Sequence, residues 1–291
     1  MCDELNRRQA MTLNNGMTIP PIGYGTYPHT QQLLDSIPKA VRLGCKLIDS
    51  SDNYGGEQVV GEALRACQCE AADVTIVSKF SRPERTYELE RCFDEGEAAL
   101  GRGIDVYLLH WPYPHLWREQ WRRMERLYLE GRCSAIGVCN FEVGKLEELL
   151  RFCEVMPSVN QFECHPLFQQ RDLCDFCRDA GIVTMSYSPL ARMAPELVDN
   201  KVMLDVASSH GRTVSQVVMR WNIQRGRIPI PAARSERHIR ENVEVFDFAL
   251  SDEEMASVDA LERGMRVRFD PRTRFGMRSR ARFLARRIVR H

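Results

Sequence analysis

Four titratable residues of complementary chemistry stand at or just after the ends of predicted strands. Asp49 follows the apolar run KLI, Lys79 lies near the end of VTIVSKF, His110 follows DVYLL, and Tyr54 comes five residues after Asp49. A phenol, an ammonium, a carboxylate and an imidazole are groups from which proteins build sites for proton transfer. Each residue alone also has a purely structural explanation, so it is their joint occurrence that indicates acid–base chemistry.

Eight short apolar runs alternate with amphipathic stretches and predict eight strands separated by helices. The candidate strands are IGYG near residue 22, KLIDS near 46, VTIVSKF near 74, DVYLLHW near 105, SAIGVCNF near 134, SVNQFECH near 158, IVTMSYS near 182 and RIPIPA near 227. Strands that alternate with helices pair in parallel through crossover connections.

This repeat favours an α/β fold of the closed (β/α)8 TIM-barrel type over an open doubly wound sheet, which usually has about five or six strands. No GxGxxG phosphate loop follows the first strand, which also disfavours the open sheet. The carboxyl ends of barrel strands share one rim, where catalytic residues lie. We therefore expect the four titratable residues to meet there with the polar residues that end later strands: Asn140, Gln161, Tyr187 and Ser188.

The segment MTLNNGMTI predicts an N-terminal β-hairpin in which Asn15 and Gly16 form a two-residue turn. No composition break or low-complexity linker divides the chain before its Arg-rich end. We expect one domain over residues 1–291, with its core at about 10–265 and a basic C-terminal segment at 266–291.

The composition is typical of a globular protein, with 291 residues and 44% hydrophobic residues. No run of about 18 apolar residues and no secretory leader is evident, so we predict a cytoplasmic protein. Eleven cysteines without a second paired motif indicate reduced thiols. Cys174 and Cys177 have redox-motif spacing, but they lie within a predicted helix, where we expect buried structural thiols.

The C-terminal end is strongly basic, with ten arginines and one aspartate between Met265 and His291, whereas the formal net charge of the chain is zero. Such a segment could contact nucleic acid or a membrane, and FLARRIVRH could form a short amphipathic helix. The favoured interpretation is a solvated terminal helix or tail. We expect no nucleic-acid and no membrane partner.

From the hairpin to the segment VFDFALSDEEM, about residues 10–265, the chain resembles the aldo-keto reductase family, in particular its prokaryotic, diketogluconate-reductase-like members. Five stretches carry the likeness: RLGCKLIDSSDNYGGE, VSKF, IDVYLLHWP, GRCSAIGVCNF and VNQFECHP. The resemblance implies reduction of a small-molecule aldehyde or ketone to an alcohol by hydride transfer from NAD(P)H. It also implies a monomer or weak homo-oligomer whose C-terminal segment borders the substrate site.

The resemblance further implies that Asp49, Tyr54, Lys79 and His110 form a catalytic tetrad. Tyr54 would donate a proton to the carbonyl oxygen as that oxygen gains negative charge. The Lys79 ammonium would stabilise the phenolate and lower the pKa of Tyr54 from its usual value near 10. Asp49 would keep Lys79 charged, and His110 would orient the carbonyl by hydrogen bonding.

By the same resemblance, the rim would bind the cofactor. Asn140 and Gln161 would bind the nicotinamide carboxamide, and Tyr187 would stack on the nicotinamide ring. Cys139 stands where the family usually has serine, and because a thiol is a weak donor, we expect a weaker carboxamide contact there. The other expected cofactor contacts on the rim are Gly25, Thr26, Asp49, Ser188 and Leu190.

The substrate pocket would be walled by Tyr27 and Trp111. Tyr113 and Trp117 could also shape it, whereas Trp121, with Met124 and Leu127, has the spacing of a buried helix face. The segment after the fourth strand is short, so we expect an open pocket.

The adenosine end departs from the family pattern. Ala232 and Ala233 replace a Lys-Ser pair, and His238 replaces an arginine that grips the ribose 2′-phosphate in many members. Three arginines are close by, and one of them could restore the grip because a guanidinium binds phosphate through two hydrogen bonds: Arg234, Arg237 and Arg240. We expect NADPH to be favoured, with NADH left open. The remaining expected contacts at this end, for the adenine, are Glu241 and Asn242.

Two other functions are weighed against reduction. A zinc site of Asp49, His110 and His165 is disfavoured because it leaves Tyr54 and Lys79 unexplained, so we predict no metal. A nicotinamide-binding regulatory or scaffold protein on the same barrel is the alternative. An enzyme would oxidise bound reduced cofactor when a carbonyl is added, whereas a sensor would only bind it.

Overall fold

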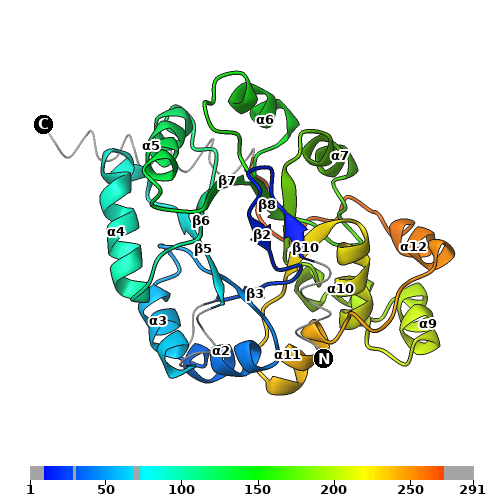
Figure 1. Cartoon of the computed structure of the whole chain (residues 1–291). Helices are drawn as coiled ribbons and strands as arrows, with labels where there is room; N and C mark the ends of the chain where they lie inside the picture. The colour runs from blue at the N-terminus through cyan, green and yellow to red at the C-terminus, as the bar shows by residue number, and fades with distance from the viewer. Residues whose placement is uncertain (1–9, 29–30, 68–72, 272–291) are drawn as a thin grey trace, which may run out of the picture.

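The computed structural model describes residues 10–28, 31–67 and 73–271, and its centre is a sheet of eight parallel strands (Figure 1). In sheet order the strands are β3 (Tyr24–Gly25), β4 (Leu47–Asp49), β5 (Thr75–Phe80), β6 (Val106–Leu109), β7 (Ala135–Cys139), β8 (Val159–Glu163), β9 (Val183–Tyr187) and β10 (Arg227–Ile230). These are the eight strands predicted from the sequence, in chain order around the sheet.

The sheet closes on itself between its first and last strands. The backbone N–H of Gly23 donates to the carbonyl of Pro229 at 3.0 Å, and that of Gly25 donates to the carbonyl of Pro231 at 2.9 Å. A Cβ atom on Gly23 would lie 2.5 Å from side-chain atoms of Leu47, so a glycine is needed where the barrel interior is this tightly packed. The prediction of a (β/α)8 barrel is confirmed.

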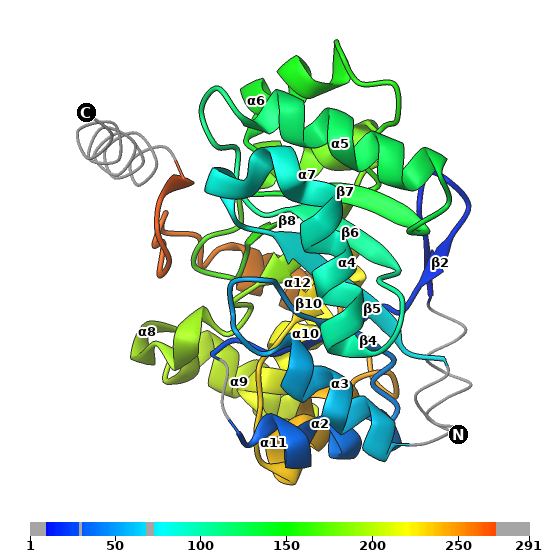
Figure 2. The same ribbon diagram turned by 90° about the vertical axis from the view of Figure 1, so that its left-hand side faces the viewer.

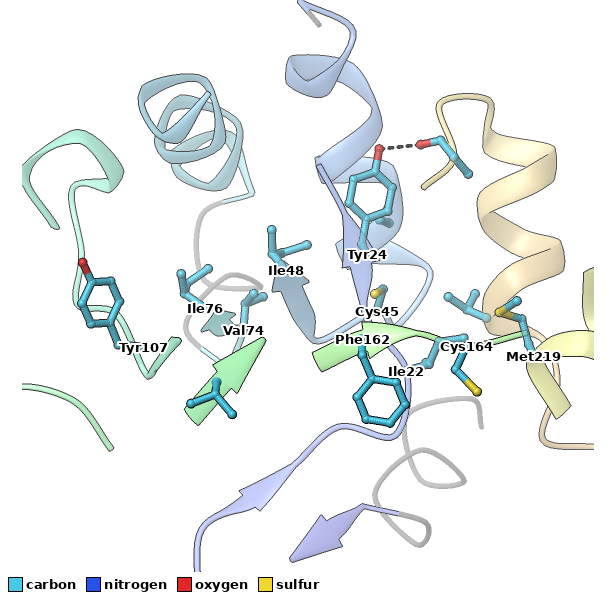
Figure 3. Close-up of a cluster of buried hydrophobic side chains, with 14 of the residues drawn as sticks. Ile22, Tyr24, Cys45, Ile48, Val74, Ile76, Tyr107, Phe162, Cys164 and Met219 are labelled. Carbon is cyan, nitrogen blue, oxygen red and sulfur yellow. Dashed lines mark hydrogen bonds between the residues drawn. The ribbon is translucent and has the colours of Figure 1, made fainter. Parts of the chain in front are cut away.

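Side chains along each strand alternate between the barrel interior and the layer beneath the helices. Leu47, Val77 and Val106 belong to the interior cluster, whereas their neighbours Ile48 and Ile76 pack in the outer cluster. Figure 3 shows part of this outer cluster. Because both faces of the sheet are covered, most strand residues are buried, and apolar residues predominate on both faces of the strands.

An outer ring of helices covers the barrel (Figure 1). The helix α5 illustrates the pattern, since Trp121, Met124 and Leu127 are fully buried on one face, as predicted. The α-helices are α2 (Leu33–Arg42), α3 (Glu57–Ala66), α4 (Leu89–Leu100), α5 (Trp117–Leu129), α6 (Val143–Leu150), α7 (Arg171–Asp179), α8 (Pro195–Val198), α9 (Lys201–Ser209), α10 (Val214–Gln224), α11 (Glu236–Val243) and α12 (Asp252–Asp259). Two 3₁₀ helices, η2 (Pro83–Glu88) and η3 (Ala191–Met193), lie between them.

The predicted N-terminal hairpin is present as β1 (Met11–Thr12) and β2 (Thr18–Ile19), but its turn was wrongly predicted. The N–H of Leu13 donates to the carbonyl of Met17, which leaves three residues in the loop instead of two. Gly16 has φ of +88° and ends this loop in the left-handed region, as three-residue hairpin loops require. The hairpin lies at one end of the barrel, opposite the segment near residue 265 (Figure 2).

The C-terminal segment is described as far as residue 271, so the predicted terminal helix at FLARRIVRH lies outside the described residues. In the described part of the chain, no helix is both long and apolar enough to span a membrane.

Candidate active site

A buried ion pair lies at the carboxyl ends of β4 and β5. Lys79 is fully buried, and its Nζ donates to Asp49 Oδ2 at 2.7 Å and to the carbonyl of Ser50 at 2.7 Å. Burial lowers the pKa of Lys79, but the negative charge of Asp49 outweighs that effect and the net pKa lies above its ordinary value. Lys79 is therefore charged at neutral pH.

Tyr54 lies directly beside this ion pair. Its ring centroid is 5.3 Å from Lys79 Nζ and 5.8 Å from the centroid of the His110 ring. Desolvation raises the pKa of Tyr54 to about 12, although the Lys79 charge lowers it as expected. The predicted lowering by the ammonium is present, but desolvation exceeds it, so the net pKa lies above the ordinary value. The phenol is thus protonated at neutral pH.

His110 is held by two hydroxyl groups. Its Nδ1 contacts the hydroxyls of Ser81 and Ser51, the latter at 3.1 Å. Burial, together with the Lys79 charge, holds the pKa of His110 well below its ordinary value, so the ring is neutral. When Nδ1 accepts a hydroxyl proton, the ring proton resides on Nε2 and can be donated to a substrate oxygen.

The side chains predicted to hold the nicotinamide make two sets of hydrogen bonds at the rim. Tyr187 Oη donates to Asn140 Oδ1 at 2.7 Å, and Asn140 Nδ2 donates to the carbonyl of His110 at 3.1 Å. Gln161 Nε2 donates to Asp49 Oδ1 at 2.7 Å. The structure therefore brings Asn140, Gln161 and Tyr187 together with the predicted tetrad.

Cys139, which precedes Asn140, points into the barrel interior cluster and is buried. Burial raises the pKa of this thiol well above its ordinary value, so it is neutral. Asn140 and Ser188 follow β7 and β9 with φ of +61° and +49°, a left-handed backbone that is uncommon outside glycine and concentrates at functional sites. Leu190, two residues after Ser188, is half-buried against the outer cluster.

Gly25 and Thr26, the residues near β3 that were predicted to contact the cofactor, lie next to Asp49 of the tetrad. The N–H and the hydroxyl of Thr26 both donate to the carbonyl of Asp49, at 3.1 and 2.9 Å. Gly25 lies against β10, where an added Cβ would meet side-chain and backbone atoms of Ile230 at 3.4 Å. Both residues thus belong to the same rim.

Arg234 does not present a free guanidinium. Its Nη2 donates to the carbonyls of Thr26 and Pro28, each at 3.0 Å, and its Nη1 donates to Tyr24 Oη at 2.9 Å. These contacts fix the segment that follows β3. The donors that we expected to bind a phosphate are therefore used within the protein.

The other residues predicted at the adenosine end lie on α11. His238 is exposed in its first turn, Asn242 is buried, and Glu241 accepts a hydrogen bond from Arg237 at 2.8 Å. Ser235 caps this helix by accepting from the N–H of His238. These residues share one helix and are separated from the tetrad along the chain.

Aromatic side chains border Tyr54 and His110. The Tyr27 ring lies 5.1 Å from the Tyr54 ring, and the Trp111 ring stacks on His110 at 5.7 Å. Tyr113 is buried and donates to the carbonyl of Ser81 at 3.1 Å, so its hydroxyl is used in packing.

Trp117 packs edge-on against Phe141 and is buried. It is one of the residues that line a hollow of about 390 Å³, but no member of the predicted tetrad lines this hollow. The candidate site is therefore defined by the predicted tetrad and the polar residues beside it, and not by this hollow. The lining residues of the hollow are Pro112, Pro114, His115, Trp117, Arg118, Lys145 and Glu148.

The alternative zinc ligands are engaged in other contacts. Asp49 binds Lys79, and His165 Nε2 lies 3.1 Å from Glu163 Oε1, with both His165 and Glu163 fully buried. Of the two cysteines expected to be buried structural thiols, Cys177 is buried on α7, whereas Cys174 is only half-buried, and both thiols are free.

Three residues that make contacts at or near the candidate site were missed by the sequence analysis. Ser51 and Ser81 hold His110, and both follow strand ends, so they could have been added to the polar residues of the rim. Glu163 accepts from the N–H groups of Val267 and Arg268 at 2.6 and 3.0 Å. These partners are more than 100 residues apart, and no local pattern signals such a contact.

Comparison with known proteins identifies the family of this chain. The model of the aldo/keto reductase family matches residues 13–263. The glyoxal reductase of Bacillus subtilis (strain 168) is 36% identical, over 91% of this chain and 96% of its own length. The methylglyoxal reductase DkgA of Escherichia coli (strain K12) is 34% identical, over 89% of this chain and 95% of its own length.

Solved structures give the same result. An aldo-keto reductase (AKR2E5) complexed with NADPH superimposes with a TM-score of 0.84 and 30% identity, over 89% of each chain. An aldo/keto reductase from Brucella melitensis has a TM-score of 0.83 and 34% identity, over 87% of this chain and 99% of its own. These matches confirm the predicted enzyme class of NAD(P)H-dependent oxidoreductases. The chain belongs to the aldo/keto reductase family.

Proposed function

We propose that this protein reduces an aldehyde or ketone to an alcohol, with Tyr54 as the proton donor and NADPH as the favoured cofactor. The bound nicotinamide would supply the hydride to the carbonyl carbon. Tyr54 and His110 would hold the carbonyl oxygen between the phenol and the imidazole Nε2. Lys79, kept charged by Asp49, would stabilise the negative charge that develops on Tyr54 as its proton leaves.

The observation that carries this proposal is the position of Tyr54 between a buried ammonium and a neutral imidazole. Lys79 has no solvent exposure, so its field acts on the phenol with little screening. His110 is neutral and anchored through Nδ1, which leaves Nε2 free to donate. A proton donor, an electrostatic stabiliser and an orienting donor are therefore adjacent.

The residues of the rim fit a nicotinamide. The amides of Asn140 and Gln161 are buried polar groups that offer both a donor and an acceptor to a carboxamide. The half-buried ring of Tyr187 offers a face for stacking, while Ser188 and Leu190 follow it along the rim. Solved relatives in complex with NADPH and with NADP support the choice of cofactor.

For the adenosine end, we propose that Arg234 shapes the cofactor site indirectly, by holding Gly25 and Thr26. His238, exposed in the first turn of α11, is the candidate for contact with the 2′-phosphate, with Glu241 and Asn242 near the adenine. The ratio of the dissociation constants for NADPH and NADH, measured in wild type and His238→Ala, tests this assignment. A ratio unaffected by the substitution contradicts the role of His238.

The catalytic proposal is tested by following the loss of NADPH absorbance with methylglyoxal, glyoxal and 4-nitrobenzaldehyde. Tyr54→Phe is expected to lower kcat by roughly 10²–10⁴, the usual contribution of a general acid. Tyr87→Phe is the matched control, because it removes the same hydroxyl group from a ring that is 72% exposed and lies beside Arg123. Its kcat should stay within twofold of wild type.

Two outcomes would contradict the proposal. A Tyr54→Phe variant with near wild-type kcat would remove Tyr54 from the role of proton donor. A wild-type protein that binds NADPH tightly but reduces no carbonyl would favour the regulatory or scaffold alternative.

A further inference from the structure

Two cysteine thiols meet between the carboxyl end of β8 and the helix α7. Cys164 directly follows β8 and is fully buried in the outer cluster (Figure 3), whereas Cys174 lies on α7 and is half-buried. Both sulfurs lie close to the carbonyl oxygen of Gln169, at 3.3 Å for Cys164 and 3.4 Å for Cys174. Because they share this oxygen, the two sulfurs are neighbours in the fold.

A buried arginine lies against this thiol pair. Arg227, the first residue of β10, is 6% exposed, and its Nη1 donates to Cys164 Sγ at 3.3 Å. Its Nε is buried without a hydrogen-bond partner, and Arg227 forms no ion pair with a carboxylate in the part of the chain that the structure describes. A buried cation without an anion is unfavourable, so this environment favours negative charge on the neighbouring sulfur.

The two thiols differ in how readily they lose a proton. Burial raises the pKa of Cys164, but the hydrogen bond with Cys174 and the charge of Arg227 outweigh burial, and the net pKa lies below its ordinary value. The hydrogen bond with Cys164 raises the pKa of Cys174, and burial acts in the same direction. When one proton leaves the pair, Cys164 therefore becomes the thiolate, which is the nucleophilic form of cysteine.

Cys177, which has redox-motif spacing from Cys174, lies in a different environment. It is fully buried, and Asn160 Nδ2 donates to its sulfur at 3.7 Å. Burial raises the pKa of Cys177 to about 11. The hydrogen-bonded thiol partner of Cys174 is thus Cys164, and not the cysteine that the spacing along the chain suggests.

We propose that Cys164 and Cys174 form a peroxide-reactive pair that closes to a disulfide bond. The Cys164 thiolate attacks one oxygen of hydrogen peroxide, the O–O bond breaks, hydroxide leaves, and Cys164 becomes a sulfenic acid. The sulfur of Cys174 then attacks that of Cys164, the S–O bond breaks, and a second hydroxide leaves. The two thiols lose two electrons and two protons, and the peroxide becomes two molecules of water. The half-buried side of the pair, at Cys174, is the side from which the peroxide enters.

The bond is located by mass spectrometry of the folded, full-length protein after reaction with hydrogen peroxide. Remaining thiols are blocked with iodoacetamide, and trypsin then places Cys164 in the peptide 152–171 and Cys174 in the peptide 172–178. The expected product is these two peptides joined by a bond that dithiothreitol breaks. A peptide 172–178 that is oxidised by itself would show a bond between Cys174 and Cys177 and would overturn the proposal.

Substitutions assign the bond within the joined peptides, which also contain Cys153 and Cys177. Cys164→Ser and Cys174→Ser should each abolish the joined product. Cys153→Ser and Cys177→Ser are the matched controls, because they remove the other thiol of each peptide, and both variants should still form it. Persistence of the joined product in Cys164→Ser or Cys174→Ser would contradict the pairing. None of these measurements depends on carbonyl reduction, so they test the thiol pair separately from the proposed function.

The role of Arg227 is tested through the rate of disulfide formation as a function of pH. Hydrogen bonds to charged groups are among the stronger ones in proteins, so Arg227→Gln should slow the reaction at pH 6 by about 10- to 100-fold. Arg227→Lys should recover part of the rate. Arg225→Gln is the matched control, because it removes the same charge two residues earlier from an exposed side chain, and its rate should stay within twofold of wild type.

Wild type alone supplies a test that does not require a variant to fold. An ordinary thiol, with a pKa near 8.5, reacts about tenfold faster for each pH unit between 6 and 8, because its thiolate fraction rises in that proportion. The rate in wild type should rise less steeply, since Arg227 stabilises the Cys164 thiolate at lower pH. A full tenfold rise per pH unit, or an equal rate in Arg227→Gln at pH 6, would show that Arg227 does not hold the thiolate.

Discussion

The substitution Asp49→Asn should destabilise the protein by removing the only carboxylate hydrogen-bonded to a fully buried ammonium within the described residues. Lys79 Nζ has two acceptors, Asp49 Oδ2 and the carbonyl of Ser50, both at 2.7 Å. Asparagine keeps the shape of the side chain, and an amide rotation of Gln161 can preserve its own hydrogen bond. The change therefore removes mainly the charge of the pair.

The expected magnitude follows from the burial of the pair. Breaking a buried ion pair from one side costs about 3–5 kcal/mol, because the remaining charge is left uncompensated. For a chain of 291 residues, an unfolding entropy of roughly 2.1 cal/mol/K per residue converts this loss into a decrease in Tm of roughly 5–8 °C.

The pH dependence of the free energy of unfolding is a second, independent test of the Asp49–Lys79 pair. In wild type the folded pKa of Lys79 is raised, so its stabilising contribution is fully present below the unfolded pKa near 10.4 and is lost only as pH rises through the folded value. In Asp49→Asn, desolvation is no longer opposed by the carboxylate, and the pKa of Lys79 should fall below that of the unfolded chain. The free energy of unfolding should then rise with pH up to about 10.4, with a slope of at most about 1.4 kcal/mol per pH unit.

Urea unfolding followed by tryptophan fluorescence at pH 6.5, 8 and 9 measures both signatures. Asp205→Asn is the matched control, because Asp205 forms a pair of the same length with Lys201, at 2.7 Å, but both side chains are exposed. An exposed helical pair is worth about 0.3–0.5 kcal/mol. If Asp49→Asn costs no more than Asp205→Asn, the Lys79 charge is not held by Asp49 and the reasoning fails.

Two further predictions concern packing and titration. Gly61→Ala should cost about 1–3 kcal/mol, because its Cβ would lie 2.7 Å from the backbone oxygen of Ala99, whereas Gly144→Ala, with open space around it, should be neutral or stabilising in thermal unfolding. Desolvation raises the pKa of Asp52 to about 6, so the folded protein binds a proton more tightly than the unfolded chain and loses stability as pH rises from about 4 to 6. Asp52→Asn should lack this loss, and equal pH profiles of urea midpoints in the two proteins would contradict the shifted pKa.

The position of the site could be predicted because parallel strands end on one rim. Asp49, Lys79 and His110 were placed together by their strand ends alone. In the structure Asp49 binds Lys79, and Lys79 Nζ and the centroid of the His110 ring lie 5.3 and 5.8 Å from the centroid of the Tyr54 ring. The hairpin turn was missed because Asn15-Gly16 suits both two-residue and three-residue loops, and the register is decided by contacts of the hairpin with the barrel, such as the hydrogen bond from Asn15 to the carbonyl of Ser134.

The partners of each arginine side chain could not be predicted from residue type. Arg234 was expected to bind phosphate, yet its donors satisfy the carbonyls that follow β3. Arg268 was counted only as part of a basic segment, yet it lies over Tyr27 because Glu163 fixes its backbone. Which donors remain free depends on partners distant in the sequence, and the pattern of residues along the chain does not contain that information.

The role proposed for Lys79 does not require Tyr54 to be ionised at rest. A phenol with its ordinary pKa near 10 is protonated at neutral pH, and burial raises the pKa of Tyr54 further. In the proposed mechanism the buried ammonium acts when the proton moves to the carbonyl oxygen and negative charge appears on the Tyr54 oxygen. An interaction that becomes strong only as this charge develops lowers the barrier without stabilising the resting state, which is the requirement for catalysis. In that mechanism the burial of Lys79 would keep water from screening the charge.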